Sequence, residues 1–187
     1  MIKVSEDTKI YVYCPAGVAT GGAELLHQLV SILNDNGRDA YIVYYGESEH
    51  KIPTDYLKYN IKIITEKEIE NKPTNIEVIF EGRFDFALHN DMTQKVLWWL
   101  SVDNFFKCSI DFLSPIDLFK FNVKLGLRGI KSQLKYLIKH RSLRDGILNI
   151  KKLRKMGVLH AYQSEYAQNF LTLNNFSEML PLKDFIN

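Results

Sequence analysis

The sequence predicts an α/β protein built on a mostly parallel sheet, with helices on both faces. Three consecutive segments at the start of the chain carry this prediction. Residues 9–14 are a nearly continuous β-prone run, which is typical of a strand that is buried on both faces. A glycine loop and an amphipathic helix follow, and residues 40–45 form a second β-prone run. Strand, helix and strand joined by short loops form a right-handed βαβ unit, in which the two strands are parallel.

The helix between these two strands has clear boundaries. Glu24 lies in its first turn, where the helix dipole favours an acidic side chain. The run from Asn34 to Gly37 ends the helix, and Gly37 suits a left-handed C-terminal cap. Apolar residues recur at helical spacing and form one stripe: Ala23, Leu26, Leu29, Val30 and Leu33.

The rest of the chain continues the α/β pattern less regularly. Further strands are predicted at residues 60–65, 75–80 and 95–100. Residues 84–91 are predicted as a helix or a turn. Residues 157–163 are predicted as another strand, and Ser164 is a suitable N-cap for a helix over residues 165–173. The chain ends in an apolar run, residues 179–187, for which the sequence indicates no closing element.

Length and composition predict one domain, residues 1–187, with an ordinary core. The chain is 46% hydrophobic and 25% charged, as is usual for soluble globular proteins. It has no run of about 20 apolar residues, and its first residues do not follow the signal-peptide pattern. Two cysteines, Cys14 and Cys108, are too few for a disulfide framework or a zinc site, so we expect a reducing, cytoplasmic setting and no bound metal.

The net charge of +2 conceals a strong asymmetry. Between Lys120 and Lys155 there are 12 Lys and Arg residues and one acidic residue, Asp145, so the rest of the chain is acidic. We expect a basic helical insertion over residues of about 116–156. Gly126 and Gly129 are predicted to break it into two pieces. A basic block on an acidic body indicates a charged partner.

Six cationic residues in this insertion recur at helical spacing and are predicted to share one helix face: Lys120, Lys124, Arg128, Lys131, Lys135 and Lys139. Apolar and aromatic residues occupy the rest of the circumference. A basic amphipathic helix of this kind is typical of attachment to an anionic membrane surface. Two alternatives are a solvated helix that packs its apolar side on the domain, and nucleic-acid binding. Nucleic acid is not expected, because the remainder of the chain is acidic and has no RNA-binding motif.

Both ends of the chain resemble the N-terminal half of retaining family 4 glycosyltransferases of the GT-B fold. The resemblance depends on Gly21-Gly22-Ala23-Glu24 after the first strand, on Asn36-Gly37 and on the strand at residues 40–45. It is supported by residues 160–171, which resemble the strand, serine and helix near the end of such domains. Residues 180–185 resemble the segment that leads into the hinge between two lobes. The middle of the chain diverges.

The resemblance implies a Rossmann-like domain that forms the acceptor side of a two-lobed enzyme. The full enzyme is expected to transfer a sugar from a nucleotide sugar to a membrane-associated, envelope or lipid-linked glycan, at the inner face of the membrane. A second, C-terminal lobe carries most donor contacts in the family and is missing from these residues, so this chain alone is expected to be inactive. No cofactor besides the nucleotide-sugar co-substrate is implied. The alternatives are a non-enzymatic membrane- or nucleic-acid-binding module and a dinucleotide-binding domain.

The glycine loop is the first candidate site. Glycines let a backbone approach a ligand closely, and a helix N-terminus offers N–H groups to an anion. By resemblance, Gly17, Gly21 and Gly22 are expected to contact the donor phosphates or the acceptor. The loop is alternatively a simple turn. The sequence lacks G-x-G-x-x-G, although Glu47 lies where a ribose-binding acid of a dinucleotide fold is expected.

Further candidates follow later strands. Asp103 and Asn104 come after residues 95–100, at the same sheet edge as the glycine loop if all strands are parallel. The family often places a His or Asp near this point, so Asp103 is the candidate catalytic residue, which orients or deprotonates the acceptor hydroxyl, and Asn104 is a candidate binding residue. A solvated turn is the alternative. Arg83 is expected either to hold a phosphate or to pair with Glu81 or Asp85.

Four other residues are interpreted as structural or left open. His160 lies in the middle of a strand and is predicted to be a packed core histidine, whereas the role of His89 is open. Cys14 adjoins the glycine loop, but no pattern around it indicates a nucleophile. Trp98 and Trp99 are adjacent in a strand and therefore point to opposite faces of the sheet.

Overall fold

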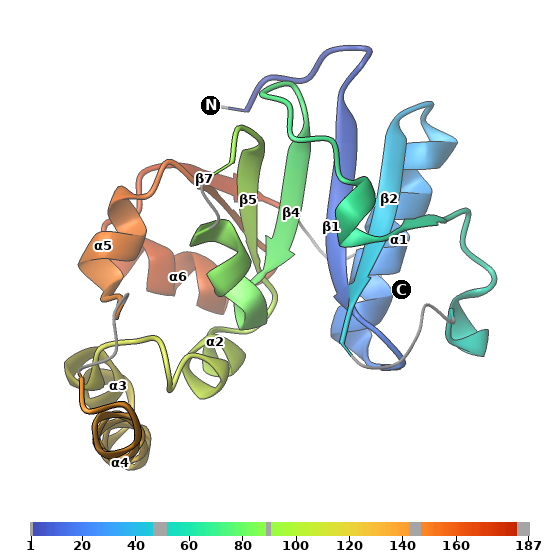
Figure 1. The fold of residues 1–187 in the computed structure, drawn as a ribbon. Helices are drawn as coiled ribbons and strands as arrows, with labels where there is room; N and C mark the ends of the chain where they lie inside the picture. Colours follow the sequence, from blue (N-terminus) through green and yellow to red (C-terminus); the bar gives the residue numbers. More distant parts are fainter. Residues whose placement is uncertain (1, 47–51, 89–90, 143–146, 183–187) are drawn as a thin grey trace.

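The computed structural model describes residues 2–46, 52–88, 91–142 and 147–182. Within these residues the strands form one parallel sheet of seven strands, in the order β3-β2-β1-β4-β5-β6-β7 (Figure 1). The strands are β1 Lys9–Pro15, β2 Asp39–Tyr45, β3 Lys62–Ile64, β4 Ile76–Phe80, β5 Gln94–Trp99, β6 Leu159–Tyr162 and β7 Met179–Pro181. All six pairings are parallel, so the predicted α/β, Rossmann-like fold is confirmed.

The strand order reverses at β1, which lies beside both β2 and β4. After β1 the chain continues into helix α1 (Gly21–Asp35) on one face of the sheet. After β4 it continues into the 3-10 segment η3 (Glu81–Leu88), whose aromatic side chains pack on the other face. The loops that follow β1 and β4 therefore diverge at a topological switch point, where open α/β sheets bind their ligands.

Each face of the sheet has its own hydrophobic core. Side chains alternate along β1, so Tyr11 and Tyr13 pack on the face that η3 covers, whereas Val12 packs on the face that α1 covers. Trp98 and Trp99 also lie in different cores, which confirms their predicted opposite orientations. The η3 face is covered further by α2 (Val102–Cys108) and α6 (Glu165–Leu173), and the α1 face by η1 (Thr54–Tyr56).

Helix boundaries follow the local sequence signals. Thr20 caps the N-terminus of α1, where its hydroxyl accepts a hydrogen bond from the Ala23 N–H. The chain leaves this helix through Gly37, whose φ of +73° confirms the predicted left-handed conformation. Ser164 caps α6 as predicted. Residues 84–88 belong to η3, η2 (Glu66–Glu68) is a further 3-10 turn, and residues 89–90 lie outside the described residues.

The basic insertion is helical, as predicted, and consists of α3 (Pro115–Phe121), α4 (Val123–His140) and α5 (Ile150–Lys155). Two predictions about it are wrong. Gly126 and Gly129 do not break the helix, because α4 is continuous through both. The break falls instead at Asn122, an extended residue that ends α3 and caps α4. Lys120 therefore lies on α3 and not on the helix face that carries the other five cations.

The two glycines serve the packing of α4 against α3. A Cβ atom at Gly126 would lie 2.2 Å from Cγ of Phe119, and one at Gly129 would lie 2.5 Å from Cδ1 of Leu118. Because residues early in α4 face residues late in α3, the two helices form an antiparallel pair joined at Asn122. Intrinsic propensity disfavours these glycines in a helix, but close contact between the helices requires them.

Gly129→Ala is expected to lower the free energy of unfolding by about 1–2 kcal/mol, although alanine is the better helix former. The added methyl group meets Leu118, which is fully buried and has little room to move. Urea denaturation followed by circular dichroism measures the change. Gly157→Ala is the matched control, because its Cβ meets no atom within 4 Å. Equal stability of the two variants would contradict the tight packing of α3 on α4.

The end of the chain differs from the prediction. Residues 179–181 form strand β7, which pairs with β6 and closes that edge of the sheet, whereas the sequence indicated no closing element. The run is only three residues long, and helix α6 lies between it and its partner strand, so no local signal identifies it. Of the segment expected to lead into a hinge, Leu180 and Pro181 lie in β7, and residues 183–187 lie outside the described residues.

Candidate functional site

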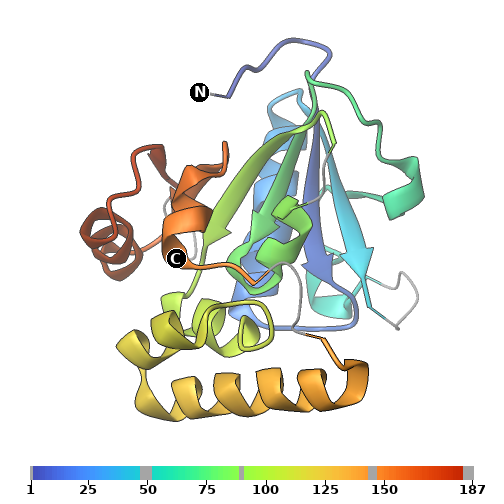
Figure 2. The ribbon, with the colours of Figure 1, turned by 60° about the vertical axis from the view of Figure 1, so that its left-hand side comes forward.

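The candidate site lies at the carboxyl-terminal edge of the sheet, where the loops after β1, β4 and β5 come together. Because all the described strands are parallel, each of these loops leaves the sheet at the same edge. The α3–α4 pair lies beyond this same end of the sheet (Figure 2). The switch point and the basic helices therefore occupy one end of the molecule.

The glycine loop brings an open helix N-terminus to this edge. Gly17 has a φ of +68°, which only glycine adopts readily, and it turns the chain toward α1. Gly21 and Gly22 are the first two residues of α1, where N–H groups have no partner within the helix. A Cβ atom built on Gly21 would meet nothing within 4 Å. The backbone at Gly21 is therefore accessible to a ligand.

Tyr56 holds this loop in position. Its hydroxyl accepts a hydrogen bond from the Thr20 N–H at 2.9 Å and donates one to the Thr20 carbonyl at 3.0 Å. The Tyr56 side chain is buried and also packs 4.2 Å from the ring of His27, between ring centroids. The N-cap of α1 is thus fixed from outside the βαβ unit. The sequence offers no signal for this contact, because 36 residues separate the two partners.

Glu81 is a functional candidate that the sequence reasoning missed. It directly follows β4, is 1% exposed, and accepts a hydrogen bond at Oε2 from the Leu100 N–H at 2.8 Å. Burial raises the pKa of Glu81 from 4.5 to about 7, although hydrogen bonds from backbone N–H groups partly oppose the rise. A carboxyl group that titrates near neutrality at a switch point is suited to proton transfer. The available signal was an acidic residue at the end of an otherwise apolar strand.

Leu100 connects this carboxyl group with the glycine loop. Its Cδ1 atom lies 3.6 Å from the position of a Cβ on Gly22, while its N–H binds Glu81. The start of α1 and the residues that directly follow β4 and β5 are therefore in contact through Gly22, Glu81 and Leu100. This contact places Glu81 and the first turn of α1 on either side of one leucine.

Arg83 also lies at this edge, but its charge is already compensated. Its guanidinium donates from Nε to Asp85 Oδ1 and from Nη2 to Asp85 Oδ2, both at 3.0 Å. It also lies over the rings of Phe86, at 3.8 Å, and Tyr45, at 4.5 Å. The predicted alternative of an ion pair with Asp85 is confirmed, whereas Glu81 is not its partner. The pair leaves Arg83 about one-third exposed.

Asp103 and Asn104 lie in the first turn of α2, which begins just after β5. Ser101 caps this helix and accepts a hydrogen bond from the Asn104 N–H at 3.3 Å. Both candidate side chains are exposed, and the carboxylate of Asp103 accepts a 3.3 Å hydrogen bond from Tyr166 on α6. Within the described residues no hydrogen bond or ion pair joins Asp103 to Arg83. Asp103 and Arg83 therefore lie at the same edge of the sheet but belong to separate hydrogen-bond networks.

The remaining candidate histidine and cysteine are structural. His160 is 2% exposed and accepts a hydrogen bond at Nδ1 from the Trp99 indole, and burial lowers its pKa to about 4. The prediction of a packed core histidine is confirmed. Burial raises the pKa of the Cys14 thiol to about 12, so it stays protonated at neutral pH and is a poor nucleophile. Glu47 and His89 lie outside the described residues.

His27, which the sequence reasoning did not consider, anchors α1 to the sheet. It is fully buried, donates from Nδ1 to the Ala23 carbonyl at 2.7 Å, and accepts at Nε2 from the Tyr44 hydroxyl at 2.6 Å. Burial lowers the pKa of His27. Because both nitrogens have partners inside the fold, this histidine supports the glycine loop and does not face a ligand.

The basic helix α4 has a cationic face and an exposed apolar face. Five of the six predicted cations lie on it, namely Lys124, Arg128, Lys131, Lys135 and Lys139, and the helix contains no acidic residue. Leu125 of α4 packs in the core, but most of the apolar side chains of this helix are exposed. We call the exposed residues Val123, Leu127, Ile130, Leu134, Leu137 and Ile138 the apolar stripe. Ile138 is 80% exposed and Val123 66%, which is unusual for side chains of this size.

No helix among the described residues is long and apolar enough to cross a bilayer. In the same part of the chain, His, Cys, Asp and Glu residues form no group of three or more that could hold a metal ion. The chain matches no model of a known protein family, and no curated protein is similar to it in sequence.

Proposed function

We propose that this chain is the acceptor-side domain of a retaining glycosyltransferase, which transfers a sugar from a nucleotide sugar to a membrane-associated or envelope glycan. One observation carries the proposal: at the switch point of a parallel sheet, Leu100 joins the first turn of α1, which is open at Gly21, to the buried carboxyl group of Glu81. The resemblance of both chain ends to family 4 enzymes adds support. The reaction requires a second lobe that supplies most donor contacts.

In this proposal each candidate residue at the carboxyl-terminal edge of the sheet has its own role. Gly17 shapes the loop, and the N–H groups of Gly21 and Gly22 face the donor phosphates. Asp103, exposed on α2, orients or deprotonates the acceptor hydroxyl, and Asn104 donates or accepts a hydrogen bond beside it. Arg83 offers its remaining N–H groups to a phosphate while Asp85 fixes its plane. The nucleotide sugar is a co-substrate, and no other cofactor is invoked.

The proposed setting is the inner face of a membrane. The apolar stripe lies next to five cations on one helix, as in helices that lie in the interface of anionic bilayers. Each cation near such a surface contributes about 1 kcal/mol. Nucleic acid is not proposed as a partner, because it would leave the apolar stripe in water. A non-enzymatic membrane-binding module is the second candidate, and the same stripe favours it.

Phosphate binding at the glycine loop tests the enzymatic proposal. We expect nucleoside-diphosphate sugars and inorganic pyrophosphate to shift the amide resonances of Gly21 and Gly22 in proton–nitrogen correlation spectra. Gly21→Ala should weaken this binding about tenfold, because its methyl group occupies the space where the ligand approaches the N–H groups. The substitution meets no atom of the protein, so folding is unaffected.

Gly157→Ala, equally free of contacts and remote from the site, is the matched control and should bind like the unaltered chain. An absence of amide shifts at millimolar ligand would favour the non-enzymatic module. Saturation by NAD, with no response to nucleotide sugars, would assign the loop to dinucleotide binding.

A further inference from the structure

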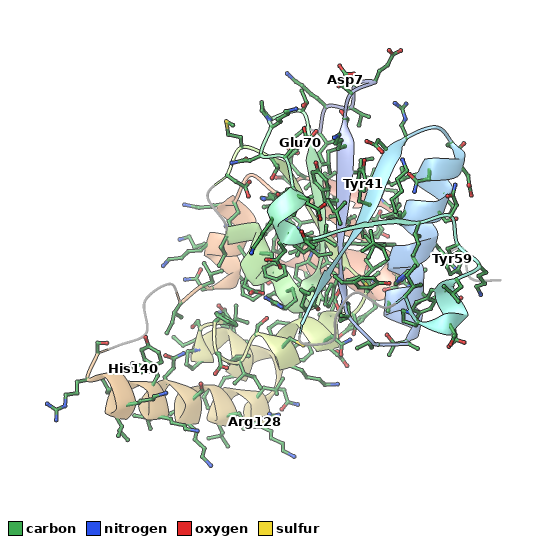
Figure 3. The ribbon with its side chains drawn as sticks, turned by 45° about the vertical axis from the view of Figure 1, so that its right-hand side comes forward. Asp7, Tyr41, Tyr59, Glu70, Arg128 and His140 are labelled. Atoms are coloured by element: carbon green, nitrogen blue, oxygen red, sulfur yellow. The ribbon has the colours of Figure 1, made fainter. Side chains whose placement is uncertain are left out.

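A basic groove of about 690 Å³ lies between α2 and α4. We define it by the cationic residues that line it, Lys107, Arg128, Lys131, Lys135 and Lys139, together with His140. One carboxylate, Asp111, also lines the groove and accepts a hydrogen bond from the Ser132 hydroxyl. The groove runs along α4, and Arg128 and His140, which are twelve residues apart on this helix, lie toward its two ends (Figure 3). Five cations facing one carboxylate favour a multiply charged anion.

Three lysines border the basic groove on one side and the apolar stripe on the other. Lys131, Lys135 and Lys139 line the groove, and they also line a second hollow of about 510 Å³. The other residues of that hollow are Leu127, Ile130, Leu134 and Ile138, all members of the apolar stripe. A row of lysines therefore separates a cationic recess from an apolar surface. This arrangement matches a molecule with an anionic head and a hydrocarbon chain.

We propose that the basic groove binds the phosphate or diphosphate head of an anionic amphiphile, whose hydrocarbon chain lies along the apolar stripe. The inference deepens the proposed function, because it rests on membrane attachment through α4 and assigns a specific head-group site beside the attachment surface. Lys and Arg bind phosphate oxygens through charge-assisted hydrogen bonds. The lysine stems cross from the apolar surface to the groove, as lysines do at membrane interfaces.

Helix α2 connects this groove with the candidate acceptor residue. Lys107 lines the groove from the last turn of α2, and Asp103 lies in the first turn of the same helix. Residues four apart share a helix face and are separated by about 6 Å along the axis. A sugar that is joined to a phosphate in the groove would therefore extend toward Asp103. This identifies the acceptor class as a lipid whose glycan is linked through phosphate.

A second copy of the chain is the main competing occupant of the apolar stripe. Val123, Leu127, Ile130, Leu134 and Leu137 are spaced alternately by four and three residues, as in a coiled-coil seam. Pairing two α4 helices would, however, bring ten cations together with no acidic residue on either helix. Charge complementarity therefore favours an anionic lipid over self-association.

Farnesyl diphosphate, used below the concentration at which it forms micelles, is a suitable soluble probe. Isothermal titration calorimetry should show one saturable site on the unaltered chain, with pyrophosphate and farnesol binding at least tenfold more weakly because each lacks one half of the contacts. The groove variant Lys107→Gln/Arg128→Gln should weaken binding by about tenfold or more. The control variant Lys120→Gln/Lys124→Gln loses the same charge outside the groove and should change binding less than about threefold.

Sedimentation with phosphatidylglycerol vesicles distinguishes the head-group site in the groove from membrane attachment through α4. Binding to vesicles without discrimination between the groove and control variants would overturn the head-group site and leave membrane attachment standing. An absence of vesicle binding would overturn the attachment itself. Equal binding of pyrophosphate and farnesyl diphosphate would identify a free phosphate ligand and overturn the amphiphile. Displacement of farnesyl diphosphate by a short oligothymidine would assign the groove to nucleic acid, and dimers in analytical ultracentrifugation would assign the stripe to a second copy.

Discussion

Leu134→Ser/Ile138→Ser is expected to weaken binding to vesicles that contain phosphatidylglycerol by about a hundredfold. Both side chains belong to the apolar stripe and are 53% and 80% exposed, so the fold loses little packing when they are shortened. In the bilayer interface each contributes about 1.5 kcal/mol of hydrophobic transfer free energy, and the two contributions multiply in the binding constant. The charge of α4 is unchanged, so the loss reports on apolar insertion alone. Vesicle sedimentation over a range of lipid concentrations measures it.

Leu57→Ser/Leu173→Ser is the matched control. These leucines are 63% and 81% exposed and lie outside the basic insertion, so their replacement should leave vesicle binding unchanged. Raising the salt concentration should weaken binding of the unaltered chain, because the cations of α4 act through screened electrostatics. Equal vesicle binding by the control and stripe variants would show that α4 does not enter the interface.

Glu81→Gln is expected to stabilise the protein by up to about 3 kcal/mol at pH 8 and to have little effect near pH 4.5. The folded state raises the pKa of Glu81 from 4.5 to about 7, so it binds the proton more tightly than the unfolded state does. The corresponding stability is fully present below pH 4.5 and is lost as the pH rises through 7. At 1.36 kcal/mol per pKa unit, the loss is about 3 kcal/mol. Glutamine stays neutral and keeps an oxygen that can accept the hydrogen bond from Leu100.

Urea denaturation of both proteins at several pH values between 4.5 and 8 measures this difference. Comparison at each pH is essential, because His160 acts in the opposite direction. Burial lowers the pKa of His160 from 6.5 to about 4, so its contribution is present above pH 6.5 and is lost as the pH falls toward 4. The two groups partly cancel in the unaltered protein, and Glu81→Gln should expose the slope that His160 produces. A difference that is constant with pH would show that the Glu81 carboxyl group titrates at its ordinary value.

Local sequence signals predicted the elements that are determined by local physics. The βαβ unit, the left-handed Gly37 and the Ser164 cap each depend on residues within one or two turns of one another. Strand β7 was missed because a run of three residues is too short to show the alternating pattern of a strand. Its pairing with β6 depends on tertiary structure and not on local sequence. Gly126 was misinterpreted for a related reason. Helix propensity alone predicts a break at Gly126, whereas close packing against Phe119 requires a glycine at this position within α4.

The candidate site was predicted in outline, because parallel strands bring their carboxyl ends to one edge. Its electrostatics were not predictable. Nothing next to Arg83 distinguishes Glu81 from Asp85 as its partner, since the choice depends on which carboxylate the fold buries. The basic face of α4 was predicted apart from Lys120, which the bend at Asn122 places on another helix. The exposure of the apolar stripe could be established only from the structure, because an amphipathic pattern does not specify whether another part of the protein covers the apolar face.

The outermost strands of the sheet bear on how this protein avoids aggregation. Each of them, β3 and β7, is only three residues long, and β7 ends in Pro181, which has no N–H group to donate. On the other side, Lys62 begins β3 and adds a charge to that rim. Edge strands that are short, charged or end in proline are poor templates for pairing with a strand of another molecule. Pairing of this sheet with the edge strand of another copy is therefore disfavoured at both described edges.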